Sequence, residues 1–157
     1  MKNNKISVGA WFACCVAILA IASLIVYSVN VASAGYFQGA AVQGLIVRLV
    51  IAIACEVVAF ALGLLKVNGI AGKLVDIVIG ACQIAAPFLI AMCLMTLAAA
   101  RVEGLGFIYF SNADVAKEVQ TPANLASAIG SIAAMICLAV SMLAGMVSAF
   151  LNIRKEA

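Results

Sequence analysis

One acidic residue lies deep inside an apolar stretch of this sequence. Glu56 stands ten residues before Lys66. In a helix with a rise of 1.5 Å per residue, that spacing places it about 15 Å from the nearest basic loop. A carboxyl group near the middle of a bilayer is costly, and such a group is by default a candidate functional site with a partner. Glu56 is therefore the first candidate for binding a proton or a cation.

The hairpin that contains Glu56 indicates a partner for it. Two apolar stretches turn back on each other around the middle of 66–73, which brings position 83 level with position 56. Gln83 occupies that position, so we predict a hydrogen bond between its amide and Glu56. In a structural interpretation, protonated Glu56 and Gln83 fix the register of two helices with a bond of about 0.6 kcal/mol. In a functional interpretation, Glu56 couples a proton or a cation to transport.

Arg48 completes the intramembrane polar candidates. It lies eight residues from Glu56, about 12 Å along a helix, and its long stem is expected to carry the charge to the outer surface. Direct pairing of the two is therefore not expected. The chain has no histidine, which removes the usual proton shuttle and the commonest metal ligand. We expect no metal, no other cofactor and no catalytic residue, because no nucleophile–base pair or phosphate-binding loop is present.

The cysteines are interpreted as packing residues. All six lie in apolar stretches, where a free cysteine behaves as a small hydrophobic side chain. No two of them have the CxxC spacing of a thiol redox centre or of a zinc site. The residues are Cys14, Cys15, Cys55, Cys82, Cys93 and Cys137.

Four long apolar stretches must position these residues. They cover 6–29, 44–65, 74–100 and 123–153, and each exceeds the roughly 20 residues that cross a bilayer as a helix. Of the 157 residues, 68% are hydrophobic and 10% charged, against about a quarter charged in a soluble domain. We predict an all-α integral membrane four-helix (tetraspan) bundle, with 1–157 as a single transmembrane domain and the lipid bilayer as its solvent.

The first stretch also has features of a signal peptide. It follows a basic start, and Ala-Ser-Ala at 32–34 resembles a cleavage site. Its apolar region of about 24 residues is longer than the roughly 7–15 of such peptides. We therefore predict a true membrane span.

Basic residues predict the orientation. With four spans, the segments that carry most of them share one side, and the positive-inside rule assigns that side to the cytoplasm. We expect both termini inside, in the plasma (inner) membrane, with outer loops over 30–43 and 101–122. A net charge of +3, with no basic run longer than two residues, leaves no footprint for nucleic-acid binding. The basic residues of the inner segments are Lys2, Lys5, Lys66, Lys73, Arg154 and Lys155.

The second outer loop is long enough to form a structured cap. Its aromatic side chains suit the interfacial belt of membrane proteins. Ser111 or Asn112 is placed to cap a short helix through 114–120. Thr121 and Pro122 then supply an N-cap and a first-turn proline for the fourth span. The candidate residues of this outer cap are Tyr109, Asn112 and Asp114.

The fourth stretch carries small residues at four-residue spacing, a pattern that lets helix backbones approach closely. One interpretation is packing inside the bundle of a single chain. The other is a face for self-association or for a partner helix. The residues are Ala126, Gly130, Ala134, Ser141, Gly145 and Ala149.

These patterns favour two functions. The leading hypothesis is a non-catalytic membrane protein that acts through helix–helix association, as an accessory subunit of another membrane protein or as a homo-oligomer. The alternative is a small oligomeric transporter or channel that uses Glu56 and Gln83, with Arg48 nearby. The chain is similar to small multidrug transporters in size and number of spans, but their glutamate belongs to the first span, so no family is identified.

Overall fold

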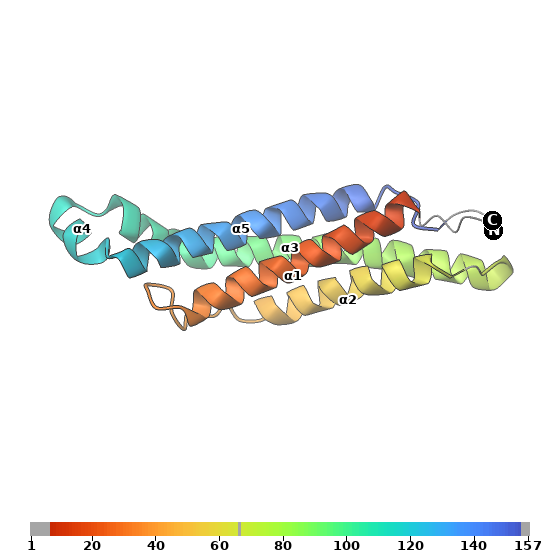
Figure 1. The fold of residues 1–157 in the computed structure, drawn as a ribbon, viewed down its shortest axis with the longest axis horizontal. Coiled ribbons are helices and arrows are strands. Elements are labelled where there is room, and N and C mark those ends of the chain that lie inside the picture. Colours follow the sequence, from red (N-terminus) through yellow and green to blue (C-terminus); the bar gives the residue numbers. More distant parts are fainter. Residues whose placement is uncertain (1–6, 66, 155–157) are drawn as a thin grey trace, which may run out of the picture.

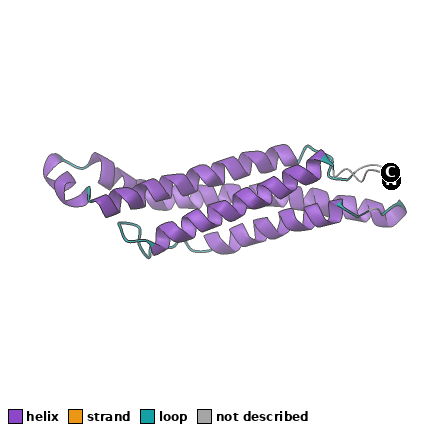
Figure 2. Cartoon of the chain, in the orientation of Figure 1, coloured by secondary structure: helices purple, strands orange, loops and turns teal. Residues whose placement is uncertain are grey.

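The computed structural model describes residues 7–65 and 67–154. Four of its helices are long and apolar enough to cross a membrane, and they pack as a bundle (Figure 1, Figure 2). The prediction of an all-α, multi-span membrane protein is therefore confirmed. The helices are α1 (Val8–Ala32), α2 (Leu45–Gly63), α3 (Gly69–Phe110), α4 (Ala113–Val119) and α5 (Pro122–Ser148).

The four long helices form a closed ring. Helix α1 packs against α2 and α5, and α3 packs against the same two helices. The connection between α2 and α3, the start of α1 and the C-terminal end of the described chain lie at one end of the bundle (Figure 1). We call this the terminal end. The α1–α2 loop and α4 lie at the other end, the cap end. The expected start of span one at Ile6, together with Lys2, Lys5, Lys66 and Lys155, lies outside the described residues.

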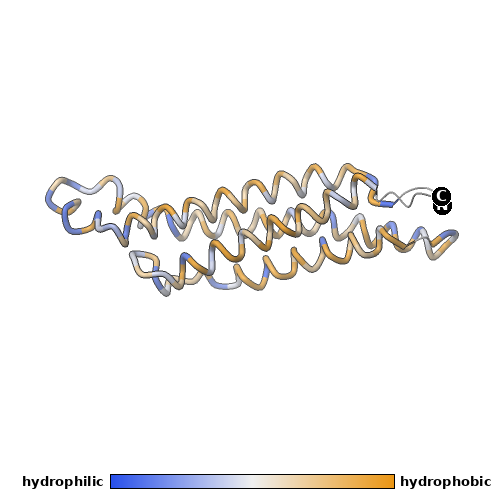
Figure 3. Tube along the Cα trace, viewed as in Figure 1, coloured by the Kyte–Doolittle hydropathy of each residue, from blue (hydrophilic) through white to orange (hydrophobic). Residues whose placement is uncertain are grey.

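The outer surface of the bundle is apolar. Figure 3 shows hydrophobic residues along all four long helices, with hydrophilic ones gathered at both ends. Each long helix exposes more than half of at least one large aliphatic side chain. Such a surface suits contact with lipid rather than with water. Examples, one from each helix in chain order, are Ile18, Val47, Ile84 and Ile136.

Side-chain caps begin the two helices that follow α3. Asn112 accepts a hydrogen bond from the Val115 N–H at 3.0 Å and starts α4. Thr121 accepts one from the Asn124 N–H at 3.2 Å, and Pro122 follows it as the first residue of α5. Both start signals predicted from the sequence are confirmed, because each side chain satisfies an N–H that has no partner in the helix.

Helix α3 is much longer than the predicted span 74–100. It has 42 residues, about 63 Å at the helical rise, and its last ten residues occupy half of the expected outer loop 101–122. A close contact holds this extension in place. A Cβ atom at Gly104 would lie 2.6 Å from ring atoms of both Tyr36 and Phe37, so the glycine allows these rings of the α1–α2 loop to pack on the helix.

The fourth span is shorter than predicted, since α5 ends at Ser148 rather than at 153. Residues 149–154, which we call the C-terminal segment, fold back over the terminal end. Ile153 is 3% exposed, and the Ser7 hydroxyl donates a hydrogen bond to its carbonyl. A Cβ atom at Gly9 would lie 2.6 Å from the carbonyl oxygen of Asn152, so this glycine admits the segment against α1.

Labelling of introduced cysteines tests the expected orientation of this bundle. Gln38 and Glu118 are exposed at the cap end and Asn68 is exposed at the terminal end. With the native cysteines replaced, we expect cysteines at 38 and 118 to react with an impermeant maleimide in whole cells, and one at 68 to react only after lysis. Labelling of position 68 in intact cells would reverse the orientation.

Candidate functional site

Glu56 lies on the inner face of α2 and is completely buried, with 0% of its surface exposed. Neither of its carboxyl oxygens has a hydrogen-bond partner among the described residues. Among the buried residues of α2 it is the one with a polar side chain. A buried carboxyl group without a partner is unfavourable by several kcal/mol or must bind a proton or a cation.

The surroundings of Glu56 are small and weakly polar. Ala52 and Ala59, about one turn to either side on α2, are both fully buried and belong to two separate apolar clusters. Glu56 therefore lies at the junction between these clusters. The thiol of Cys82 on α3 faces the thiol of Cys55 on α2.

Gln83 does not pair with Glu56, so this prediction is wrong. Its side-chain Nε2 instead donates a hydrogen bond of 2.7 Å to the carbonyl of Ser148, the last residue of α5. Carbonyls in the last turn of a helix lack intrahelical partners and attract side-chain donors. The hairpin spacing indicates the depth of position 83, but not the direction in which its side chain leaves α3. Cys82, one residue earlier, faces α2 instead.

Arg48 lies apart from Glu56. Its side chain turns back toward the start of α2, where Nη2 would be 3.5 Å from a Cβ atom at Gly44. Nη1 is buried and has no hydrogen-bond partner among the described residues. The side chain is therefore directed toward the cap end, as snorkelling predicts, but its Nη1 does not reach the surface there. Glu56, Gln83 and Arg48 therefore do not form one site, and neither of the other two bonds to Glu56.

The stripe of small residues in α5 faces the inside of the bundle. Ala134, Ser141 and Gly145 are buried, and a Cβ atom at Gly145 would lie 3.1 Å from Cβ of Pro87 on α3. A Cβ atom at Gly130 would lie 2.5 Å from the amide of Asn30 on α1. Of the other two members, Ala126 is exposed and Ala149 half-buried. The other four members therefore pack within one chain, and association through the stripe stays a prediction.

Asn30 connects α1 to α5 and was not among the site residues predicted from the sequence. Its Nδ2 donates to the Ser127 carbonyl at 2.7 Å, and its Oδ1 accepts from the Ser131 hydroxyl at 2.9 Å. The Ser23 and Ser141 hydroxyls, 3.2 Å apart, make a second polar contact between α1 and α5. The signal for these contacts was the run of serines on the buried side of the fourth stretch.

The cap end is organised by Arg101, which was expected at the start of an outer loop. Its side chain is 2% exposed, stacks on the Phe37 ring at 4.4 Å and donates a 2.6 Å hydrogen bond to the Ala40 carbonyl. It therefore ties the α1–α2 loop to α3. The predicted cap residues serve the fold differently: Asn112 caps α4, whereas Tyr109 and Asp114 are exposed.

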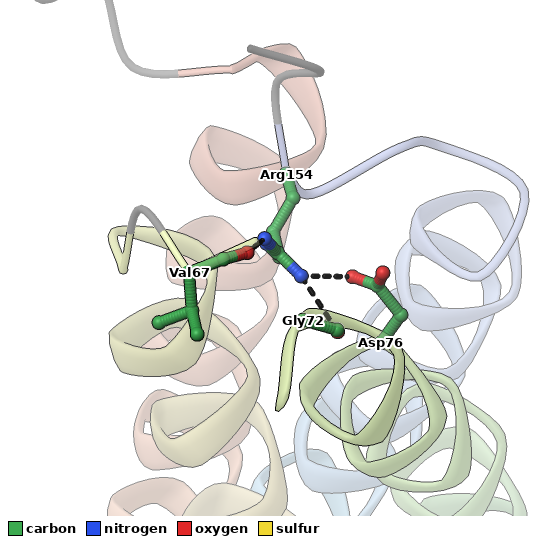
Figure 4. A network of polar contacts seen from close by, with 4 residues as sticks. All are labelled: Val67, Gly72, Asp76 and Arg154. Atoms are coloured by element: carbon green, nitrogen blue, oxygen red, sulfur yellow. Dashed lines mark hydrogen bonds and ion pairs between the residues drawn. The ribbon is translucent and has the colours of Figure 1, made fainter. Parts of the chain in front are cut away.

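A second arginine organises the terminal end. Nη1 of Arg154 contacts Oδ1 of Asp76 at 2.7 Å and the Gly72 carbonyl at 2.8 Å, and Nη2 donates to the Val67 carbonyl. Figure 4 shows these contacts converging on the guanidinium group from the α2–α3 loop and α3. The network attaches the C-terminal segment to the start of α3.

No protein-family model, curated protein or solved structure matches this chain.

The internal position of Gly145 leads to a stability prediction. In Gly145→Leu the new side chain meets Pro87, so we expect the bundle to lose about 1–3 kcal/mol, as in other overpacked cores. Gly106→Leu is a matched control, because no atom lies within 4 Å of a Cβ atom at that position. Thermal unfolding in detergent should show a lower midpoint for Gly145→Leu alone. Equal midpoints for the two variants would contradict the packing described for α5.

Proposed function

We propose that this protein is a small transporter or channel in which Glu56 binds and releases a proton. One observation carries the proposal: the Glu56 carboxyl is fully buried between helices and has no hydrogen-bond partner among the described residues. Intramembrane acids of this kind mark ion pathways and proton relays. The proposal places both termini and the α2–α3 loop in the cytoplasm, and the protein in the plasma membrane.

Proton binding fits the surroundings of Glu56 better than metal-ion binding does. A cation such as Na⁺ needs several oxygen ligands, whereas the clusters on both sides of Glu56 are apolar. Pro87 leaves the backbone carbonyl of Gln83 without its helical N–H partner, which adds one oxygen on the neighbouring helix. A proton requires no coordination shell, so we take it as the occupant and a monovalent cation as the alternative outcome.

A role based only on association is less well supported. The small residues of α5 that favoured it are used against α1 and α3 within one chain. The apolar outer faces are suited to lipid, and no described residue assigns them to a partner. Oligomer formation and a role as an accessory subunit stay predictions from the sequence. The proposed role includes no catalytic step.

Proton flux into liposomes tests the proposal. Purified protein is reconstituted, a pH gradient is imposed with the membrane potential clamped, and an internal pH dye reports the flux. We expect wild-type protein to raise the flux above that of empty liposomes and Glu56→Gln to abolish the increase, because glutamine keeps the shape but cannot titrate. Glu118→Gln, which changes an exposed acid of α4, should behave as wild type.

Two results would contradict this role. One is a wild-type flux equal to that of empty liposomes under proton, Na⁺ and K⁺ gradients. The other is an undiminished proton flux in correctly folded Glu56→Gln. A flux driven by Na⁺ or K⁺ and lost in the same variant would replace the proton by that cation.

A further inference from the structure

A groove opens at the terminal end of the bundle, apart from Glu56, which does not line it. It has a volume of about 540 Å³ and lies between the first four turns of α3 and the C-terminal segment. Gln83 is the residue of α3 that lines it farthest from the terminal end. Glu56 and this groove are therefore independent features.

The lining of the groove is amphipathic. Lys73, Asp76 and Arg154 lie near the terminal end, whereas Ile79 and Gly80 lie one to two turns deeper. Asp76 is neutralised by Arg154 at 2.7 Å. Lys73 is exposed and makes no ion pair with a described residue. Among the described residues, the charge of Lys73 is therefore unpaired, and Gly80 and the exposed Phe150 supply apolar surface in the same groove.

The apolar side chains beside Lys73 show which medium surrounds this part of α3. Ile70, Leu74 and Ile77 are 81%, 60% and 67% exposed. Because three large aliphatic side chains need an apolar medium, this part of α3 must lie in contact with lipid. The ammonium group of Lys73 can then extend to the level of the lipid phosphates.

We propose that this groove binds an anionic phospholipid from the leaflet at the terminal end. Its phosphate group contacts Lys73, and an acyl chain lies along Gly80 and the exposed ring of Phe150. Basic pockets between membrane helices bind anionic headgroups in this way. The bound lipid would hold the C-terminal segment against α3 by covering the gap between them.

Two variants separate the charge from the shape of the groove. Lys73→Gln removes the charge, with Lys117→Gln in the exposed outer cap as its control. Gly80→Phe fills the groove, since no atom lies within 4 Å of a Cβ atom at Gly80. Gly106→Phe is its control, on the same helix, with the same open space and outside the groove.

The protein is released from nanodiscs that contain equal amounts of phosphatidylglycerol and phosphatidylcholine. Native mass spectrometry then measures which lipid it retains. We expect wild type and both controls to retain phosphatidylglycerol preferentially. Lys73→Gln should lower the preference for phosphatidylglycerol roughly five-fold, the factor that corresponds to about 1 kcal/mol per basic residue. Gly80→Phe should abolish retention.

Three results would overturn the proposal. Equal retention of the two lipids by wild type would show that charge is not recognised. Unchanged selectivity in Lys73→Gln would remove the phosphate contact. Equal retention by Gly80→Phe and Gly106→Phe would place the lipid elsewhere on the protein.

Discussion

Polar groups inside this bundle find their partners on other helices, because lipid offers no hydrogen bonds. Asn30 of α1 meets Ser127 and Ser131 of α5, and small residues let the two backbones come close enough for these bonds. Ser148 is the last residue of α5, and its carbonyl accepts a hydrogen bond from Gln83 of α3. This bond connects α3 to α5. Three helices are thus aligned by a few polar contacts rather than by the apolar surface, which is equally stable against lipid.

Glu56 is an exception to this rule, because both of its carboxyl oxygens are buried without a hydrogen-bond partner among the described residues. An alanine in its place would continue the row formed by Ala52 and Ala59 without burying a polar group. The carboxyl group adds no hydrogen bond to the described structure, so its burial brings no stability from such a bond. Because this group is costly to the fold and has no hydrogen-bond partner among the described residues, we propose that it serves function rather than packing.

Much of this architecture was predictable from the sequence because lipid imposes simple rules. Four apolar stretches gave four helices, and the caps at Asn112 and Thr121 were local signals. The partner of Gln83 was not predictable, since the hairpin sets depth but not the direction of a side chain. The length of α3 was also missed, because the contacts of Gly104 with the α1–α2 loop are remote in sequence.

The two ends of the bundle show the same limit of sequence reasoning. Arg101 and Arg154 each bind backbone carbonyls that lie more than fifty residues away. Basic residues near membrane boundaries predict orientation, yet they do not reveal which loop they hold. Arg101 stacks on Phe37 and attaches the α1–α2 loop to α3 at the cap end. Arg154 attaches the C-terminal segment to α3 at the terminal end.

Infrared spectroscopy of the protein in lipid bilayers tests the central claim, that Glu56 binds an exchangeable proton. We predict a band from a protonated carboxyl group that shifts when H₂O is replaced by D₂O and that is absent from Glu56→Gln but present in Glu118→Gln. A spectrum in which Glu56→Gln removes no such band, or in which the band does not respond to D₂O, would contradict the account.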